Sequence, residues 1–216
     1  GSTEFFACGG GVNTARRFYQ KQGRWEASVR LPLVAEGRSY TLHSSIWLTA
    51  RGDDSPSGPV TPPNISGCAQ EIDVVEQYAG GHSPQSTALA HIDAFAGGPT
   101  SPTHNHCKGG WMRSGWPKTA SRPAGPTTFG RTADFTSYFT TFTLDWTESW
   151  ITMSINGTAY SSYNTAYGDG TRVADLKDAM FLWLTAHPLH RGAPVGAHDR
   201  FPLDYLVDWV RIYEWI

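Results

Sequence analysis

The stretch Gly23-Arg24-Trp25-Glu26-Ala27-Ser28-Val29-Arg30-Leu31 alternates apolar and polar side chains. Its apolar residues, from Trp25 to Leu31, fall on one side of an extended chain, and the polar residues between them fall on the other. A period of two residues is that of a β-strand with one buried face. The stretch therefore predicts a strand in a half-buried sheet.

Runs of the same kind recur along the chain. Phe142, Leu144 and Trp146 repeat the alternation, and Asn156-Gly157 supplies the two positive φ angles of a type I′ hairpin turn. Further strands are predicted over residues 43–48, 71–77, 89–95, 138–146, 150–155, 179–184 and 206–215. The one predicted helix, residues 173–178, is too short to cover a sheet. Many short strands with so little helix predict an all-β sandwich or barrel.

Size and charge restrict the class of protein. A chain of 216 residues fits one domain, so we expect a single catalytic domain over residues 1–216. The formal net charge of -2 and the scattered Lys and Arg residues offer no attractive field for nucleic acid or an anionic membrane. No run approaches the roughly 20 apolar residues that cross a bilayer. We therefore expect neither nucleic acid nor a membrane as a partner.

Aromatic residues and long connections both indicate a binding groove. Aromatic side chains make up 13% of the chain and include nine Trp, which is more than a core of this size needs. Connections rich in Pro, Gly and Ser are predicted over residues 52–67, 97–128 and 187–202. Loops of this length usually have a function, although surface decoration is the alternative. They are candidate walls of a binding site.

Cysteines and glycosylation sequons bear on the compartment. Cys8, Cys68 and Cys107 allow at most one internal disulfide, and the sequence does not identify the pair. Sequons begin at Asn64 and Asn156, and the second is also explained by the predicted hairpin turn. The sequons are compatible with the secreted protein that we expect.

Three acids stand within six positions of Glu71-Ile72-Asp73-Val74-Val75-Glu76. Glu71 and Asp73 share one face of a strand, but Glu76 has the opposite parity. A β-bulge at Val74-Val75 would add one residue and return Glu76 to the face of the other two acids. The sequence thus predicts a bulge, and bulges are common beside active sites.

The predicted spacing suits glycoside hydrolysis. With a bulge the Glu71 and Glu76 Cα atoms are roughly 13 Å apart and their carboxyl groups about 5 Å apart, which is typical of retaining glycosidases. In that mechanism one carboxylate attacks the anomeric carbon, while a protonated partner protonates the leaving oxygen and later activates water. Asp73 between them would tune both, because crowded like charges raise the pKa of at least one acid. A calcium site or a solvated strand edge are alternatives that a stiff β-branched strand disfavours.

On these residues the chain resembles glycoside hydrolase family 16, whose signature is Glu-x-Asp-x-x-Glu on a bulged strand. Similar segments follow in chain order over nearly the whole sequence. They are Gly23 to Pro32, Ser44-Ser45-Ile46-Trp47-Leu48, Asp134-Phe135, Phe142 to Trp146, the Asn156-Gly157 hairpin, and Val207 to Tyr213.

The resemblance implies a jelly-roll β-sandwich with a concave substrate cleft. It implies an endo-acting hydrolase that cleaves internal β-linkages of a polysaccharide with retention. Glu71 would be the nucleophile, Asp73 the assisting residue and Glu76 the acid/base. Five further residues are candidates for substrate binding: Trp47, His91, Trp111, Trp116 and Trp183. A core Trp at position 47 and a buried structural His at position 91 are the alternatives.

Departures from the family pattern bear on the substrate. Residues 181–187 replace the Asn-rich, Gly-ended strand of many β-1,3-glucanases, whereas Gln70 and Asp208-Trp209-Val210 look closer to agarase-like galactanases. We therefore expect an algal galactan of the agar, porphyran or carrageenan type. Alternatives are an endo-β-1,3- or β-1,3-1,4-glucanase, a transglycosylase, and a non-catalytic carbohydrate-binding module. Retention of all three acids argues against the binding module.

No cofactor is required, no metal is predicted at the catalytic site, and we expect a monomer. The resemblance allows a structural calcium ion on the convex face, with Asp208 as a candidate ligand. One predicted loop contains several His and Arg residues that could donate charge-assisted hydrogen bonds to sulfate groups of a substrate. Together with His104, His106 and Cys107, its His residues also suggest a zinc site, although no pair has a recognised ligand spacing. The His and Arg residues of this loop are His187, His190, Arg191, His198 and Arg200. An ordinary polar loop is the simpler interpretation.

Overall fold

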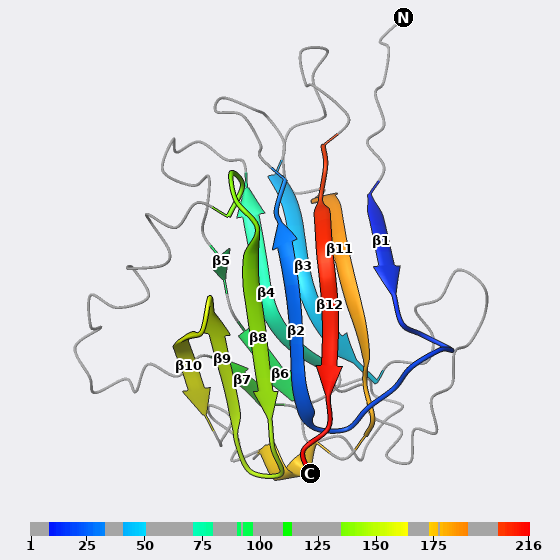
Figure 1. Ribbon diagram of the computed structural model, residues 1–216, viewed down its shortest axis with the longest axis vertical. Helices are drawn as coiled ribbons and strands as arrows, with labels where there is room; N and C mark the ends of the chain where they lie inside the picture. Colours follow the sequence, from blue (N-terminus) through cyan, green and yellow to red (C-terminus); the bar gives the residue numbers. More distant parts are fainter. Residues whose placement is uncertain are drawn as a thin grey trace, which may run out of the picture.

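The structure is a computed structural model that describes residues 9–32, 41–50, 71–79, 90–91, 93–96, 110–113, 135–163, 173–176, 178–189 and 203–216. Twelve strands run through this part of the chain, together with one short 3₁₀ helix, η1 (Val173–Asp175) (Figure 1). No α-helix occurs in the described ranges, so the predicted all-β class is confirmed. None of these residues forms a helix long and apolar enough to span a membrane.

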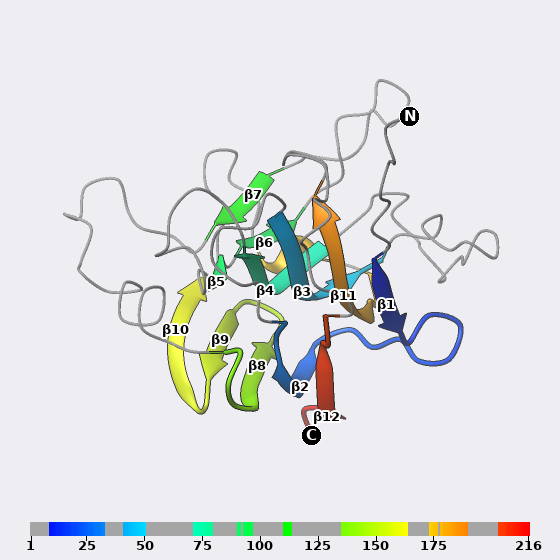
Figure 2. The ribbon, with the colours of Figure 1, turned by 90° about the horizontal axis from the view of Figure 1, so that it is seen from above.

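The strands form two antiparallel sheets. The first contains β1 (Gly10–Asn13), β3 (Thr41–Thr49), β4 (Glu71–Ala79), β5 (Ala90–His91), β6 (Asp93–Ala96), β7 (Gly110–Arg113) and β11 (Phe181–Leu189). Its order is β1-β11-β3-β4-β6-β7, and β5 also pairs with β4. The second contains β2 (Gly23–Arg30), β8 (Thr140–Trp146), β9 (Ile151–Ile155), β10 (Thr158–Tyr163) and β12 (Leu206–Tyr213), in the order β10-β9-β8-β2-β12. Figure 2 shows the two sheets as stacked layers.

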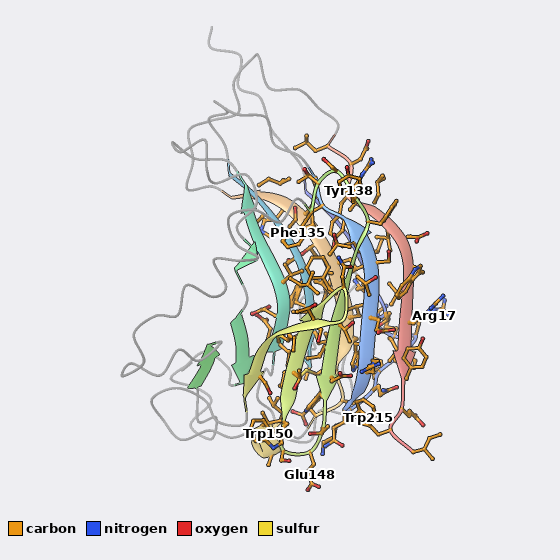
Figure 3. All side chains as sticks on the ribbon, turned by 60° about the vertical axis from the view of Figure 1, so that its left-hand side comes forward. Arg17, Phe135, Tyr138, Glu148, Trp150 and Trp215 are labelled. Carbon is orange, nitrogen blue, oxygen red and sulfur yellow. The ribbon has the colours of Figure 1, made fainter. Side chains whose placement is uncertain are left out.

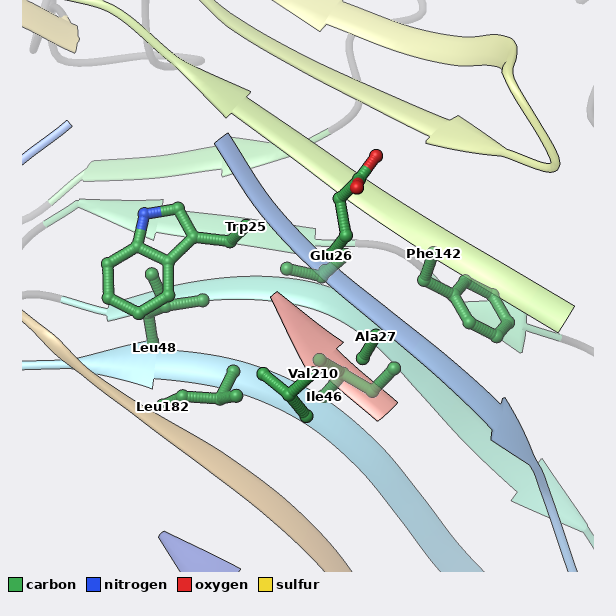
Figure 4. A pocket seen from close by; sticks show the side chains of 9 residues that line it. Trp25, Glu26, Ala27, Ile46, Leu48, Phe142, Leu182 and Val210 are labelled. Carbon is green, nitrogen blue, oxygen red and sulfur yellow. The ribbon is translucent and has the colours of Figure 1, made fainter. Parts of the chain in front are cut away.

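The core lies between the layers and follows the predicted alternation. Trp25, Ala27 and Val29 of β2 are buried, and so are Ile46 and Leu48 of β3. Burial of each large apolar side chain contributes about 1.5–3 kcal/mol. A cavity of about 10 Å³ remains between the sheets, lined by Glu26 and by apolar side chains of both sheets, as the close-up of Figure 4 shows. That volume is close to the smallest that holds one water molecule, so the two sheets are closely packed at this point.

The chain before β8 anchors the sandwich at one end. Phe135 is buried and its ring packs edge-on against Phe142, with centroids 5.3 Å apart, whereas Tyr138 is 73% exposed (Figure 3). The Leu31 backbone N–H donates to the Phe135 carbonyl at 2.8 Å. The buried ring thus connects this turn to β8, and the backbone bond connects it to Leu31, the residue that follows β2.

The predicted hairpin between β9 and β10 is confirmed. Asn156 and Gly157 have φ angles of 49° and 78°, as a type I′ turn requires. Asn156 also contacts β8, since its Oδ1 accepts from the Thr141 backbone N–H at 2.9 Å. The turn therefore fixes both the hairpin and its neighbour.

Two short strands were not predicted. β1 and β7 have the sequences Gly-Gly-Val-Asn and Gly-Trp-Met-Arg, too short and too rich in Gly to show a pattern. The interpretation of 97–128 as one connection is wrong, because β7 lies inside it and pairs with β6. The interpretation of 187–202 as a loop is wrong at its start, since β11 continues to Leu189.

Candidate active site

The predicted bulge is present in β4. Ile46 of β3 lies opposite Val75, and the next residue, Trp47, lies opposite Asp73. The register thus advances by two residues on β4 and one on β3, so Val74 is the extra residue. Both Val74 and Val75 are buried in the core.

The bulge gives the three acids one parity. Glu71, Asp73 and Glu76 lie opposite Thr49, Trp47 and Ser45, which alternate along β3. Residues directly opposite in an antiparallel pair share a face of the sheet. We call this face, which is turned away from the core, the acid face. The register places all three predicted catalytic residues on it.

Polar groups on the acid face are more buried than those on an ordinary solvated sheet. Asp73 is 6% exposed, Ser45 is 3% exposed, and Thr49 is fully buried. Glu71 is half-buried. A buried carboxylate lowers stability unless other groups compensate it. Asp73 is therefore a buried charge that its neighbours must compensate, and a sheet built only for stability would not need one.

A pair of stacked indoles borders Asp73. Trp47 lies opposite Trp183 of β11, and their rings are nearly parallel, 10° apart, with centroids separated by 5.7 Å. The Trp47 Nε1–H donates to Thr185 Oγ1 at 3.2 Å, and that hydroxyl shares a 2.7 Å hydrogen bond with Ser45 Oγ. Neither indole belongs to the core cluster. The core alternative for Trp47 is therefore wrong, since both indoles are half-buried on the acid face.

Register places two other predicted binding residues beside the acids. His91 of β5 lies opposite Glu76, and Phe95 of β6 lies opposite Glu71. Trp111 of β7 lies opposite Phe95 in turn. The strand positions of His91 and Trp111 thus belong to the acid face. Trp116 lies outside the described residues.

A histidine pair on the acid face was not predicted. His187 lies opposite His43, and their rings meet edge-on at 4.9 Å between centroids. Burial and the neighbouring His43 lower the pKa of His187. Alternation along β11 contains the missed signal, because Phe181, Trp183, Thr185 and His187 have one parity. The interpretation of His187 as a loop residue is wrong, since it lies within a strand.

Metal binding remains a prediction for most of the residues concerned. In the part of the chain that the structure describes, no three His, Cys, Asp or Glu residues are arranged to hold a metal ion. His187 alone of the proposed sulfate or zinc group lies within that part. Asp208, the candidate calcium ligand, is exposed where the β12 register shifts between Val207 and Trp209.

Comparison with known proteins identifies the fold. The sequence matches no protein-family model and no curated protein. A structure of SCLam, a non-specific endo-β-1,3(4)-glucanase from family GH16, has a TM-score of 0.56 at 18% identity, over 95% of this chain and 65% of that one. The laminarinase catalytic domain of Thermotoga maritima has a TM-score of 0.54 at 18% identity, over 95% of this chain and 69% of that domain.

A third similar structure comes from another substrate class. The κ-carrageenase of Pseudoalteromonas carrageenovora, in complex with a κ-carrageenan oligosaccharide, has a TM-score of 0.54 at 19% identity. The alignment covers 91% of this chain and 65% of that enzyme, so the present chain spans about two thirds of these relatives. The chain has the jelly-roll β-sandwich fold of the family 16 glycoside hydrolases, as the resemblance implies.

Proposed function

We propose that this protein is a retaining, endo-acting glycoside hydrolase that cleaves internal β-linkages of a polysaccharide. The observation that carries the proposal is the bulge at Val74, which gives Glu71, Asp73 and Glu76 one parity in the β4 register. A sheet built only for stability gains nothing from this device, because it brings like charges together. Enzymatic hydrolysis of a glycosidic bond uses carboxyl groups that act together on one face in this way.

The proposed reaction proceeds in two displacements. In the first, the Glu71 carboxylate attacks the anomeric carbon while Glu76, protonated, transfers its proton to the departing glycosidic oxygen. The bond between the anomeric carbon and that oxygen breaks, and a glycosyl ester of Glu71 forms. In the second, Glu76 takes a proton from water, whose oxygen attacks the anomeric carbon and releases Glu71. No metal enters either step.

Asp73 would assist without forming a bond to the sugar. It lies between the two Glu residues in sequence and is almost completely buried. A negative charge in a poorly solvated place raises the pKa of neighbouring acids, which favours the protonated form that Glu76 needs.

The stacked indoles would bind sugar rings. Trp47 is held by its hydrogen bond to Thr185, so its orientation is set before substrate arrives. The Trp183 Nε1–H is buried and meets no acceptor within the described residues. A sugar hydroxyl is a suitable acceptor for that N–H, and aromatic faces suit the apolar faces of pyranose rings.

For the substrate we propose an algal galactan, with a β-glucan as the second candidate. Trp183 lies within residues 181–187, which lack the Asn-rich, Gly-ended pattern of the corresponding strand in many β-1,3-glucanases. This difference favours the galactan. Similarity in fold to both glucanases and a carrageenase fits either polymer.

The test measures reducing-end release from agarose, porphyran, carrageenan, laminarin and mixed-linkage glucan. We expect one polymer to be cut, and Glu71→Ala to lower the rate by at least about 10³-fold. Azide should rescue Glu71→Ala and yield a glycosyl azide of inverted configuration, because it replaces the missing nucleophile. The matched control is Glu26→Gln on the five-stranded sheet, away from the acid face, where Glu26 accepts a 3.3 Å hydrogen bond from Thr143.

Three results would overturn parts of the proposal. Unchanged cleavage in Glu71→Ala would remove Glu71 as the nucleophile. Binding of a polymer without cleavage by the unmodified protein would favour the carbohydrate-binding module. Formation of longer products when an acceptor oligosaccharide is added would identify a transglycosylase, which shares the covalent intermediate.

A further inference from the structure

A second pocket opens outside the acid face, at the end of the sandwich where β2 begins and β12 ends. Its volume is about 340 Å³, within the range of small-ligand sites. The residues around it are mainly aromatic and polar. They include Tyr19, Gln20, Lys21, Gln22, Glu214 and Trp215. Nothing in the proposed hydrolysis uses them.

Trp215 supplies a fixed aromatic surface in this pocket. Its side chain is 49% exposed, yet its Nε1–H donates to the Trp146 carbonyl at 2.8 Å. The Arg24 guanidinium lies over the ring, 5.9 Å from its centroid. An exposed indole held in one orientation loses little conformational entropy when a ligand stacks on it.

The backbone of the pocket is held in an unusual conformation. Gln22 has a φ of 64°, a left-handed value that costs a non-glycine residue about 1 kcal/mol or more. Gly23 follows with a φ of 101°, and a Cβ there would collide with Gln20 and with the Tyr213 carbonyl. Gln20 bridges the two chain segments, donating to the carbonyls of Gln22 and Tyr213 at 2.9 and 3.0 Å. The pocket is therefore preformed.

A row of packed rings connects the pocket with the acid face. Tyr19 meets Phe181 edge-on at 5.7 Å, Phe181 lies 6.1 Å from Trp183, and Trp183 stacks on Trp47. This row fixes the position of the pocket relative to the acids. A polymer bound in the pocket would be held at a constant distance from the cleavage site.

We infer that this pocket is a second carbohydrate-binding site, which holds an uncharged sugar unit of the polymer away from the bond that is cut. The inference rests on the proposed function for its class of ligand. Pyranose rings present an apolar face, which suits Trp215 and Tyr19, and hydroxyl groups, which suit the side chains of Lys21 and Glu214. Because Lys21 and Glu214 carry opposite charges, the pocket favours a ligand unit without net charge.

The experiment compares binding and cleavage in the same variants. Electrophoretic retardation in gels containing each polysaccharide of the panel measures binding, and reducing-end release measures cleavage. Trp215→Ala should weaken binding of the polymer at least about 5-fold while the rate on a short oligosaccharide stays within 2-fold. Lys21→Ala combined with Glu214→Ala should also weaken binding, and it keeps the Trp146 contact intact.

The control is Trp150→Ala, because Trp150 is 48% exposed on the β8–β9 turn and does not line the pocket (Figure 3). If the unmodified protein cleaves a polymer and both pocket variants are retarded in the gel as strongly as it is, the second site is overturned and the proposed hydrolase activity stands. Retardation without cleavage would overturn the hydrolase, and the pocket variants would still decide the second site. Neither retardation nor cleavage on any polymer would overturn both.

Discussion

Among the described residues, both outer faces bury hydroxyl side chains, such as Ser28 and Thr143 on the five-stranded sheet, but the seven-stranded sheet also buries a carboxylate. On the five-stranded sheet, the Arg24 side chain is 44% exposed and pairs with Asp145 at 2.7 Å, with a second bond at 2.9 Å. On the seven-stranded sheet, the acid face buries Asp73 to 6% exposure and Ser45 to 3%. The inner faces of both sheets are mainly apolar, although they also bury Ser44 of β3 and Thr140 of β8.

This difference separates what the fold needs from what the activity needs. Exposed cross-strand pairs contribute little free energy and are tolerated anywhere on a solvated sheet. Buried polar groups each lower stability unless hydrogen bonds compensate them. The buried carboxylate Asp73 is therefore the feature of the acid face that stability alone does not require.

The largest expected effect tests the charge of Asp73. Asp73→Asn keeps the shape of the side chain but removes its charge, so we expect the turnover rate to fall about 10²–10⁴-fold with little change in melting temperature. Asp145→Asn, the same change on the exposed sheet, should leave the rate unchanged. Initial rates on the preferred polymer decide between them, and equal rates would show that burial of Asp73 serves only the fold.

The inner faces should respond alike. Leu48→Ala in the seven-stranded sheet and Leu144→Ala in the five-stranded sheet both remove a fully buried side chain from one core. Each should lower the free energy of unfolding by about 2–5 kcal/mol. Urea unfolding measures this, and a difference well above 2 kcal/mol would mean that the sheets do not share one core.

A smaller effect compares one substitution on the two outer faces. Thr185→Val removes the hydroxyl that Ser45 and the Trp47 Nε1–H both use, and should cost about 1–3 kcal/mol. Thr152→Val removes an exposed 3.1 Å hydrogen bond to Ser162 and should cost no more than about 0.5 kcal/mol. Similar losses in thermal unfolding would show that the acid face is solvated after all.

The smallest effect is a dependence on pH. His187 has a lowered pKa, so the unfolded chain binds its proton more tightly than the folded one. The contribution of His187 to the free energy of unfolding is therefore complete at a pH above 6.5, the ordinary pKa of histidine, and decreases as the pH falls below that value. Melting temperatures between pH 8 and pH 5 should decline less in His187→Gln. A curve identical to that of the unmodified protein would exclude this contribution.

Local patterns predicted the parts of the fold that alternate. The apolar residues of β2 and the parity of Glu71, Asp73 and Glu76 were enough for the strand, the bulge and the shared face. Long-range packing was not predictable in this way. β1 and β7 have too few residues for a pattern, and the partner of β1, β11, lies far away in the chain.

The candidate sites show the same limit. Trp47 and Trp183 were separate candidates, and only the pairing of β3 with β11 makes them a stacked pair. The second pocket joins Gln20 to Tyr213, which are 193 positions apart. No property of either segment alone indicates that they meet.

The bulge in β4 has a consequence for how this chain can change in length. Loss of one codon at Val74 would place the acids at every second residue of a regular strand, and all three would keep their face. Loss of Val75 gives the same sequence, whereas a one-residue deletion at another position of β4 would turn every later side chain to the opposite side. The strand therefore tolerates a one-residue deletion at the point where its spacing matters to the reaction.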